Sequence, residues 1–179
     1  MKNKKYYIID EVLTPFDLNN FYKSVTSDNI WRIDRSTQGS SVGTWAGLAV
    51  WHDKVCYNTY WFGRTVGILE NIKNVFIKKY NFPLPNEIKR IHFSAKNNTS
   101  NADFHLDTLV PYTWTIVGFM TPEWSKEWGG ELNIEGETID FVPGRFVIFK
   151  SDLKHNGSKI NKEINHWKLS LNYVLEEHQ

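Results

Sequence analysis

From residue 87 onward, the sequence is a succession of short β-prone segments separated by turn residues. No segment with a helical period lies between them, so alternating strand–helix–strand units are not expected in this half of the chain. Frequent short strands of this kind favour an antiparallel sandwich or a jelly roll. The expected strands span residues 87–95, 112–120, 130–134, 138–142, 145–149 and 167–175.

Helical patterns are confined to the part of the chain before these strands. A first helix is expected to begin at Pro15, with Thr14 as its N-cap, because proline is favoured at the first helical position. Residues 60–80 place apolar side chains at steps of three and four, which predicts a long amphipathic helix. Two further segments, 6–9 and 44–51, are expected to be strands.

Together these patterns predict a mainly β chain of the α+β class, supported by one or two long helices. Residues 1–85 would supply the helical support and outer strands, and residues 86–179 the β core. A chain of 179 residues that is 41% hydrophobic is long and apolar enough to bury a substantial core. We therefore expect a single domain over residues 1–179.

The charge balance limits the partners to be expected. The 21 basic and 20 acidic residues nearly cancel, so the chain lacks the bulk positive field that non-specific phosphate binding needs. Nucleic acid is therefore a less expected partner than a peptide, a protein or a small molecule. Cys56 is the single cysteine, and the sequence shows neither a signal-peptide pattern nor a run of about eighteen apolar residues. We expect a soluble cytoplasmic protein, and the oligomeric state is left open.

Three side chains form a candidate metal site. His105 and Asp107 stand two positions apart, so in an extended segment both would point to the same face. His155 follows after further strands and would return to supply the third ligand. Two imidazoles and one carboxylate form the ligand set by which non-haem Fe(II) oxygenases hold iron with open positions, although Zn, Mn or Co would suit the same ligands.

From about residue 87 to residue 173, the order of motifs resembles the prolyl 4-hydroxylase-like branch of the 2-oxoglutarate- and Fe(II)-dependent oxygenases. In that branch a His-x-Asp pair is followed by a strand, a Gly-Gly-Glu-Leu segment, a turn of the Pro-x-x-Gly type before an apolar strand, a distal histidine and a basic residue. The corresponding pieces here are His105-Leu106-Asp107, residues 113–120, Gly129-Gly130-Glu131-Leu132, Pro143-Gly144 with residues 146–149, His155, and Lys168-Leu169-Ser170.

The resemblance implies a fold and a set of cofactors. The fold would be a double-stranded β-helix, a cupin-like jelly roll, that holds Fe(II) and uses 2-oxoglutarate and O2. Lys168 would bind the distal carboxylate of 2-oxoglutarate together with Ser170, and His166 is the second candidate. Many relatives place a tyrosine where this chain has Phe119, so Thr115 is expected to supply the missing hydrogen-bond donor.

The resemblance also implies an activity. It favours hydroxylation of a C–H bond in a prolyl or other residue of a protein or peptide, or in a free amino acid, with release of succinate and CO2. Aromatic residues are expected near the mouth of the site, and residues 35–41 and 96–102 as recognition loops. Arg90 and His92 would face either the substrate or the solvent. The aromatic candidates are Tyr112, Trp114, Trp124 and Trp128.

Three other readings are compatible with the sequence. A nucleic-acid demethylase of the same superfamily would use the same iron site on a flipped base. A non-enzymatic jelly-roll module would bind metal weakly or not at all. A hydrolytic zinc site could be built on the same three ligands, because three protein ligands with an open position also suit water activation.

Overall fold

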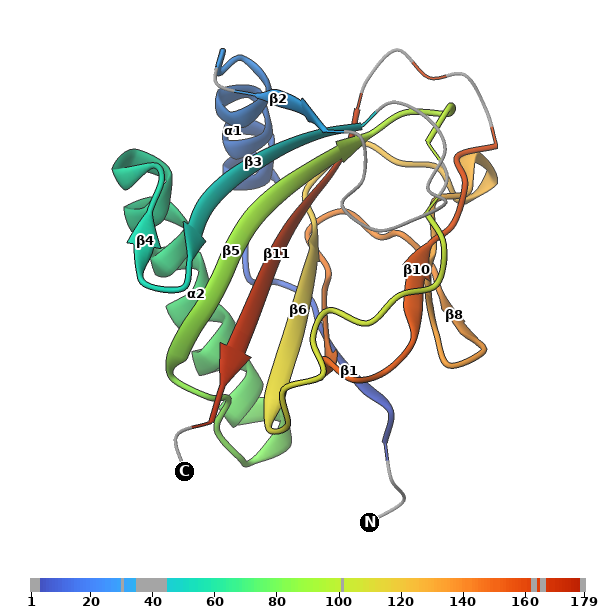
Figure 1. The fold of residues 1–179 in the computed structure, drawn as a ribbon. Coiled ribbons are helices and arrows are strands. Elements are labelled where there is room, and N and C mark those ends of the chain that lie inside the picture. Colours follow the sequence, from blue (N-terminus) through green and yellow to red (C-terminus); the bar gives the residue numbers. More distant parts are fainter. Residues whose placement is uncertain are drawn as a thin grey trace.

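Two antiparallel sheets form the framework of the protein. The computed structural model describes residues 4–29, 31–34, 45–100, 102–161, 164 and 167–177. The larger sheet has eight strands in the order β1-β9-β6-β11-β5-β3-β2, with β4 paired to β3, and the smaller sheet has the order β10-β7-β8. The two sheets face each other, and helices α1 and α2 cover the outer side of the larger one (Figure 1). This arrangement confirms the predicted mainly β, jelly-roll class.

The large sheet joins strands from both halves of the sequence. Its strands are β1 (Tyr6–Ile9), β2 (Arg32–Asp34), β3 (Trp45–His52), β4 (Val55–Cys56), β5 (Glu87–Lys96), β6 (Thr113–Phe119), β9 (Phe146–Lys150) and β11 (Lys168–Glu176). The small sheet consists of β7 (Leu132–Ile134), β8 (Glu137–Ile139) and β10 (His155–Gly157). A single 3-10 turn, η1 (Lys126–Trp128), precedes β7 in the described chain.

The two helices begin at side-chain caps. Helix α1 (Pro15–Thr26) is capped by Thr14, whose hydroxyl accepts a hydrogen bond from the Asp17 amide at 3.1 Å. Helix α2 (Thr59–Tyr80) is capped in the same way by Asn58. The predicted start of α1 is thus confirmed, and the predicted long second helix is present but begins one residue earlier, at Thr59. Within the described residues, neither helix has the length and hydropathy required to cross a membrane.

The larger core lies between the large sheet and the helices. Strand β11 shows how alternation builds it, because Leu169, Leu171 and Tyr173 are fully buried in this core. The Tyr173 hydroxyl also donates a hydrogen bond to the Thr65 carbonyl of α2 at 2.8 Å, which ties sheet to helix. The intervening residues of β11, Lys168 among them, therefore face the small sheet.

A second, smaller core fills part of the space between the two sheets. It joins residues of β6 and β9 to residues of the small sheet. Its buried members are Val117, Phe119, Leu132, Ile134, Ile139, Phe141, Val147 and Phe149. The remaining inner surface of β5 and β11 is polar, so the space between the sheets is where a functional site can form.

The short strands depart most from the sequence prediction. Strand β7 begins at Leu132 and not at residue 130, because Gly129 and Gly130 have φ values of 76° and 77° that break the extended pairing. Strand β8 ends at Ile139, three residues before the predicted end. Strands β2, β4 and β10 were not predicted. The single-domain assignment stays a prediction.

Gly118 on β6 provides a direct test of the helix-side packing. A Cβ atom there would lie 2.4 Å from Cε1 of Phe146, whose side chain is fully buried. We expect Gly118→Ala to lower the free energy of unfolding by about 1–3 kcal/mol, the usual cost of overpacking. Gly67→Ala on α2 is the matched control, because a Cβ there has open space and alanine favours a helix by up to ~1 kcal/mol. Urea denaturation of both variants checks this, and equal stability of the two would contradict it.

Candidate metal centre

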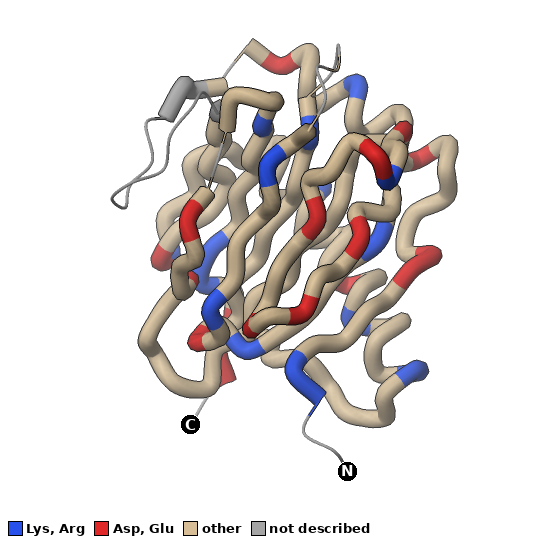
Figure 2. The backbone as a smooth tube through the Cα atoms, turned by 90° about the vertical axis from the view of Figure 1, so that its right-hand side faces the viewer, with Lys and Arg blue, Asp and Glu red and all other residues tan. Residues whose placement is uncertain are grey.

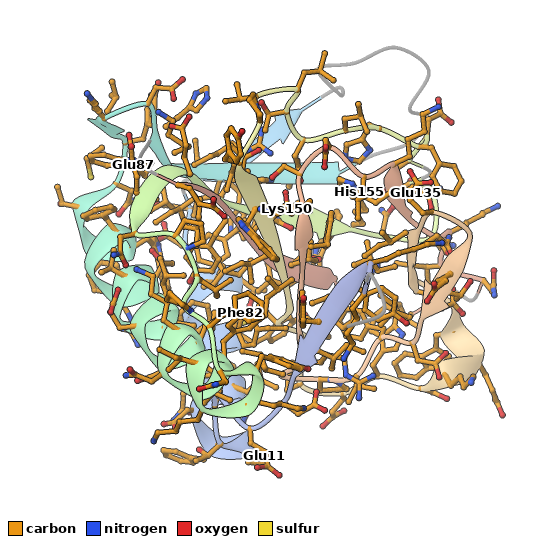
Figure 3. The ribbon with its side chains drawn as sticks, turned by 90° about the horizontal axis from the view of Figure 1, so that it is seen from below. Glu11, Phe82, Glu87, Glu135, Lys150 and His155 are labelled. Carbon is orange, nitrogen blue, oxygen red and sulfur yellow. The ribbon has the colours of Figure 1, made fainter. Side chains whose placement is uncertain are left out.

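The structure brings His105, Asp107 and His155 together. Their candidate ligand atoms all lie within 4.8 Å of one another. His105 and His155 form an antiparallel bridge in which each amide donates to the other's carbonyl at 3.0 Å. The amide of Asp107 donates to the Ser151 carbonyl at 3.2 Å, which extends the attachment. Figure 3 shows His155 on the side of the molecule opposite the long helix.

Backbone carbonyls determine which ring nitrogen each imidazole offers. Nδ1 of His105 lies 3.0 Å from the Asp103 carbonyl, and Nδ1 of His155 lies 3.0 Å from the Leu153 carbonyl. A carbonyl only accepts hydrogen bonds, so both Nδ1 atoms must carry the proton. In a neutral imidazole with its proton on Nδ1, the Nε2 lone pair is free, which is the state of a metal-ligating histidine oriented by its second nitrogen.

Asp107 is held from both sides of its carboxylate. Arg90 on β5 forms an ion pair with Oδ1, and the Thr115 hydroxyl on β6 donates to Oδ2 at 2.7 Å. The buried Ser151 hydroxyl lies 2.9 Å from that of Thr115 and can donate to it in turn. Oδ2 also lies 3.4 Å from Nε2 of His155. The carboxylate is thus fixed in place, with lone pairs left for a cation.

The electrostatics favour the protonation states that bind a metal. Burial opposes ionisation of Asp107, but Arg90, His155 and the Thr115 hydrogen bond together hold its pKa below the ordinary value. Burial lowers the pKa of His155 and so favours the neutral imidazole. A carboxylate and a neutral imidazole are the ligating forms, so the pKa shifts of Asp107 and His155 both favour binding of a divalent cation.

Thr115 has a different neighbour from the one predicted. It was expected beside the distal carboxylate of 2-oxoglutarate, but its hydroxyl contacts Asp107. Its Cα partner on β11 is Val174, whereas Phe119 is paired with Ser170 near the start of that strand. Thr115 therefore lies at the metal end of the sheet and Lys168 at the other end. Alternation along a strand predicts which face of the sheet Thr115 occupies. The group that Thr115 contacts on that face depends on how the loop carrying Asp107 folds.

Arg90 and His92 face the inner side of β5. Arg90 contacts Asp107, and burial followed by the charge of Arg90 lowers the pKa of His92 to about 3. Two buried nitrogen atoms, Nε of Arg90 and Nδ1 of His92, have no hydrogen-bond partner among the described residues. Such groups are costly when unpaired, so they are natural contacts for a polar ligand.

Lys168 lies in the interior, as its position in the alternation of β11 predicted. Its side chain is only 5% exposed, and its Nζ stands 5.3 Å from the centre of the Phe141 ring. Burial, followed by the charge of nearby Lys96, lowers its pKa to about 7, and the charge of Glu131 partly opposes this. Ser170 follows on the same face of the strand. The second candidate, His166, lies outside the described residues.

Gly130 gives the Lys168 side chain its path. A Cβ atom on Gly130 would lie 3.2 Å from Cδ of Lys168 and 3.0 Å from the Trp124 ring. The glycine of the Gly-Gly-Glu-Leu segment thus does more than permit a turn. Because it has no side chain, it leaves room for the aliphatic part of the Lys168 side chain. Trp124 lies at this end of the interior, where its indole donates to the Gly129 carbonyl at 2.9 Å.

The aromatic mouth and the loops were predicted less well. Trp114 was expected near the mouth, but it is 8% exposed and belongs to the helix-side core, so that prediction is wrong. Tyr112 is exposed, with a φ of 62°. Residues 35–41 lie outside the described residues. Lys96, which was assigned to a loop, is the last residue of β5.

A pocket of about 210 Å³ opens beside Asp107. Arg90 and His52 line it together with apolar side chains such as Val110 and Val174. Lys89 also borders it, but its ammonium is paired with Glu87 at 3.2 Å and with Glu176 at 2.6 Å. Basic and acidic residues are interspersed on the face of the molecule shown in Figure 2. The pocket is therefore mixed in character and close to one candidate metal ligand.

The sequence matches one protein-family model. Residues 91–174 match the model described as "2OG-Fe(II) oxygenase superfamily". This stretch contains all three residues of the candidate metal centre as well as Lys168. None of the curated proteins compared with the chain matches it.

Solved structures share the fold at low sequence identity. A Pseudomonas putida prolyl-4-hydroxylase has 13% identity and a TM-score of 0.66, with 98% of this chain and 95% of that chain covered. An oxidoreductase of the 2OG-Fe(II) oxygenase family from Burkholderia pseudomallei has 12% identity and a TM-score of 0.75, covering 97% and 86%. The α-ketoglutarate-dependent epimerase SnoN of nogalamycin biosynthesis has 12% identity and a TM-score of 0.69, covering 98% and 80%.

The hydrogen bond from Thr115 to Asp107 should support metal affinity. We expect Thr115→Val to weaken binding of Mn(II) or Fe(II) about ten-fold, the lower end of the effect of removing a partner of a metal ligand. Thr26→Val on α1 is the control, because its hydroxyl donates only to helix carbonyls. Isothermal titration under nitrogen measures both variants. Parental affinity in Thr115→Val would show that the hydroxyl does not orient the ligand.

Lys168 should make the stability of the ligand-free protein depend on pH. Its pKa falls from 10.5 to about 7 on folding, so between these values the unfolded chain binds more protons than the folded one. Stability should therefore rise with pH across this window, by up to about 1.4 kcal/mol per pH unit. Urea denaturation between pH 7 and 9.5 should show a smaller rise for Lys168→Met. Identical pH profiles would mean that the lysine titrates normally.

Three independent features agree. The donor set of two imidazoles and one carboxylate suits non-haem iron, and the structure presents both histidines with free Nε2 atoms. The paired sheets have the fold of known 2-oxoglutarate oxygenases, and the matching family is one that uses Fe(II) and 2-oxoglutarate. Residues 91–174 of this chain therefore belong to the 2OG-Fe(II) oxygenase superfamily.

Proposed function

We propose that this 2-oxoglutarate-dependent non-haem iron oxygenase hydroxylates a C–H bond of a prolyl or other residue in a peptide or protein, or of a free amino acid. Succinate and CO2 would be the products of the co-substrate. The observation that carries the proposal is the convergence of His105, Asp107 and His155 with the histidines in ligating tautomers. The finer assignment to the prolyl 4-hydroxylase-like branch is supported by the order of motifs in the sequence.

The three converging residues would hold the iron. When bound, the iron would activate O2 together with 2-oxoglutarate, so that an oxygen atom can be inserted into a C–H bond. Arg90 and Thr115 keep Asp107 ionised and oriented, and the carbonyls of Asp103 and Leu153 orient the two rings. The protein thus supplies a rigid ligand set, and no further acid or base is required.

The interior lysine would hold the co-substrate. A carboxylate that leaves water needs a cation and hydrogen bonds, because an unpaired buried charge is very costly. Lys168 offers a buried ammonium on the inner face of β11, and the Ser170 hydroxyl lies two residues further along the same face. We propose that these two groups bind the distal carboxylate of 2-oxoglutarate.

The pocket beside Asp107 would receive the reacting part of the substrate. Its volume of about 210 Å³ suits a side chain or a small molecule, and its wall combines charged with apolar groups. The paired state of Lys89 leaves little free positive charge for a phosphate backbone, which supports a peptide or an amino acid over nucleic acid. The unpaired nitrogens of Arg90 and His92 would suit polar groups of such a substrate.

Product analysis by mass spectrometry tests the activity. The Fe(II)-loaded protein is incubated with O2, 2-oxoglutarate and libraries of proline-containing peptides and free amino acids. We expect a product that has gained one oxygen atom, with an equal amount of succinate. His105→Ala and Asp107→Ala should lose Fe(II) binding and product together, because each removes a ligand. Glu70→Gln, on the exposed face of α2, is the control.

Other results would redirect the proposal. Formaldehyde from methylated oligonucleotides, coupled to succinate, would move the substrate class to nucleic acid. Activity that needs no oxygen would indicate hydrolysis at the same ligands. Failure of the parent protein to bind Fe(II) at stoichiometric concentrations would leave a non-enzymatic jelly-roll module.

A further inference from the structure

A second lysine lies directly opposite Lys168. Lys96 on β5 is its Cα partner across the β5–β11 pair, and both residues occupy the inner face of the sheet. A Cβ atom built on Gly157 would lie 3.5 Å from Nζ of Lys168 and 3.6 Å from Nζ of Lys96. The two ammonium groups therefore approach the same point on β10.

No acidic side chain in the described part of the chain forms an ion pair with either ammonium group. Glu131 is close enough to raise the pKa of Lys168 slightly, but burial and the charge of Lys96 outweigh it. Burial also lowers the pKa of Lys96. Two like charges that share a site of low dielectric repel each other, and an anion between them would remove that cost.

The distance along β10 between His155 and Gly157 matches the length of the co-substrate. Gly157 stands two residues after His155, which corresponds to about 6.6 Å along an extended strand. A five-carbon dicarboxylate chelated at the metal end can span that distance. The missing side chain of Gly157 leaves space where the two Nζ atoms meet, and Ser94 and Ser170 form the next pair on the same face.

We propose that Lys96 and Lys168 form a two-lysine clamp that binds the distal carboxylate of 2-oxoglutarate, one ammonium group to each oxygen. Lys96 is then a specificity-determining residue that favours a dicarboxylate over a 2-oxo acid with one carboxylate. A charge-assisted hydrogen bond from each lysine gives the shared anion two partners from different strands. This inference rests on the proposed function, because it names a second group for the same co-substrate.

Titration with two matched acids tests the clamp. The full chain is loaded with Mn(II) under nitrogen and titrated with 2-oxoglutarate and with 2-oxopentanoate, which has the same number of carbons but lacks the distal carboxylate. We expect Lys96→Met to weaken 2-oxoglutarate binding about ten-fold, as the loss of a charge-assisted hydrogen bond implies, and to leave 2-oxopentanoate binding unchanged. Lys168→Met should have an equal or larger effect. Lys78→Met, on the exposed side of α2, is the matched control.

The Tm of the ligand-free protein is a second measurement, and it should not fall when the affinity for 2-oxoglutarate falls. Removal of one of two like charges should leave the Tm of the ligand-free protein unchanged or raise it, although the variant binds 2-oxoglutarate less well. A purely structural lysine would instead lower both. Lys96→Gln keeps a polar end and is used in the same titrations if Lys96→Met does not fold.

The outcomes separate this inference from the proposed function. If the metal-loaded parent binds 2-oxoglutarate and Lys96→Met keeps the parental affinity and preference, the clamp is wrong and the proposed function stands. Equal loss of both acids in Lys96→Met would also overturn the clamp, because the distal carboxylate would not be involved. If the metal-loaded parent does not bind 2-oxoglutarate, the proposed function fails and the clamp fails with it.

Discussion

The reciprocal backbone bridge between His105 and His155 is the interaction on which the centre depends. It joins the segment before β6 to the small sheet, and the two 3.0 Å hydrogen bonds fix the separation of the two imidazoles. The adjacent hydrogen bond from Asp107 to Ser151 adds the carboxylate to the same rigid strip. Main-chain pairing therefore sets where the three residues stand, while the side chains of Arg90 and Thr115 orient the Asp107 carboxylate and keep it ionised.

Positively charged side chains lie at both ends of the inner face of the large sheet. Arg90 supplies a positive group next to the candidate metal ligands, while Lys96 and Lys168 supply positive groups at the other end of the inner face. An anionic co-substrate would thus meet cations at both ends, one of them the metal. The apolar residues of the second core, such as Phe149 against the His155 ring at 4.8 Å, limit water between these ends. Lower local dielectric strengthens every such contact.

Much of the fold followed from periodicity, and the failures have physical reasons. Alternation along β11 separated buried Leu169 from inward-facing Lys168 correctly, since each face of a strand has its own environment. Strand β10 was missed because His-Asn-Gly has no apolar pattern, and only its register with β7 makes it a strand. Among site residues, the metal triad was found from spacing, and the structure brings it together. Lys96 was missed although the alternation of Arg90, His92 and Ser94 continues to it, because the strand was ended one residue too early.

Gly130 has a consequence for the conformation of the Lys168 side chain. The side chain of Lys168 passes Gly130, where φ is 77°, so closely that a Cβ atom on this residue would lie 3.2 Å from Cδ of the lysine. The path of the lysine side chain therefore depends on the absence of a side chain at Gly130. Any residue with a Cβ atom at position 130 would meet both the steric cost of a positive φ and a clash with the lysine, so one glycine secures the turn and the buried cation together.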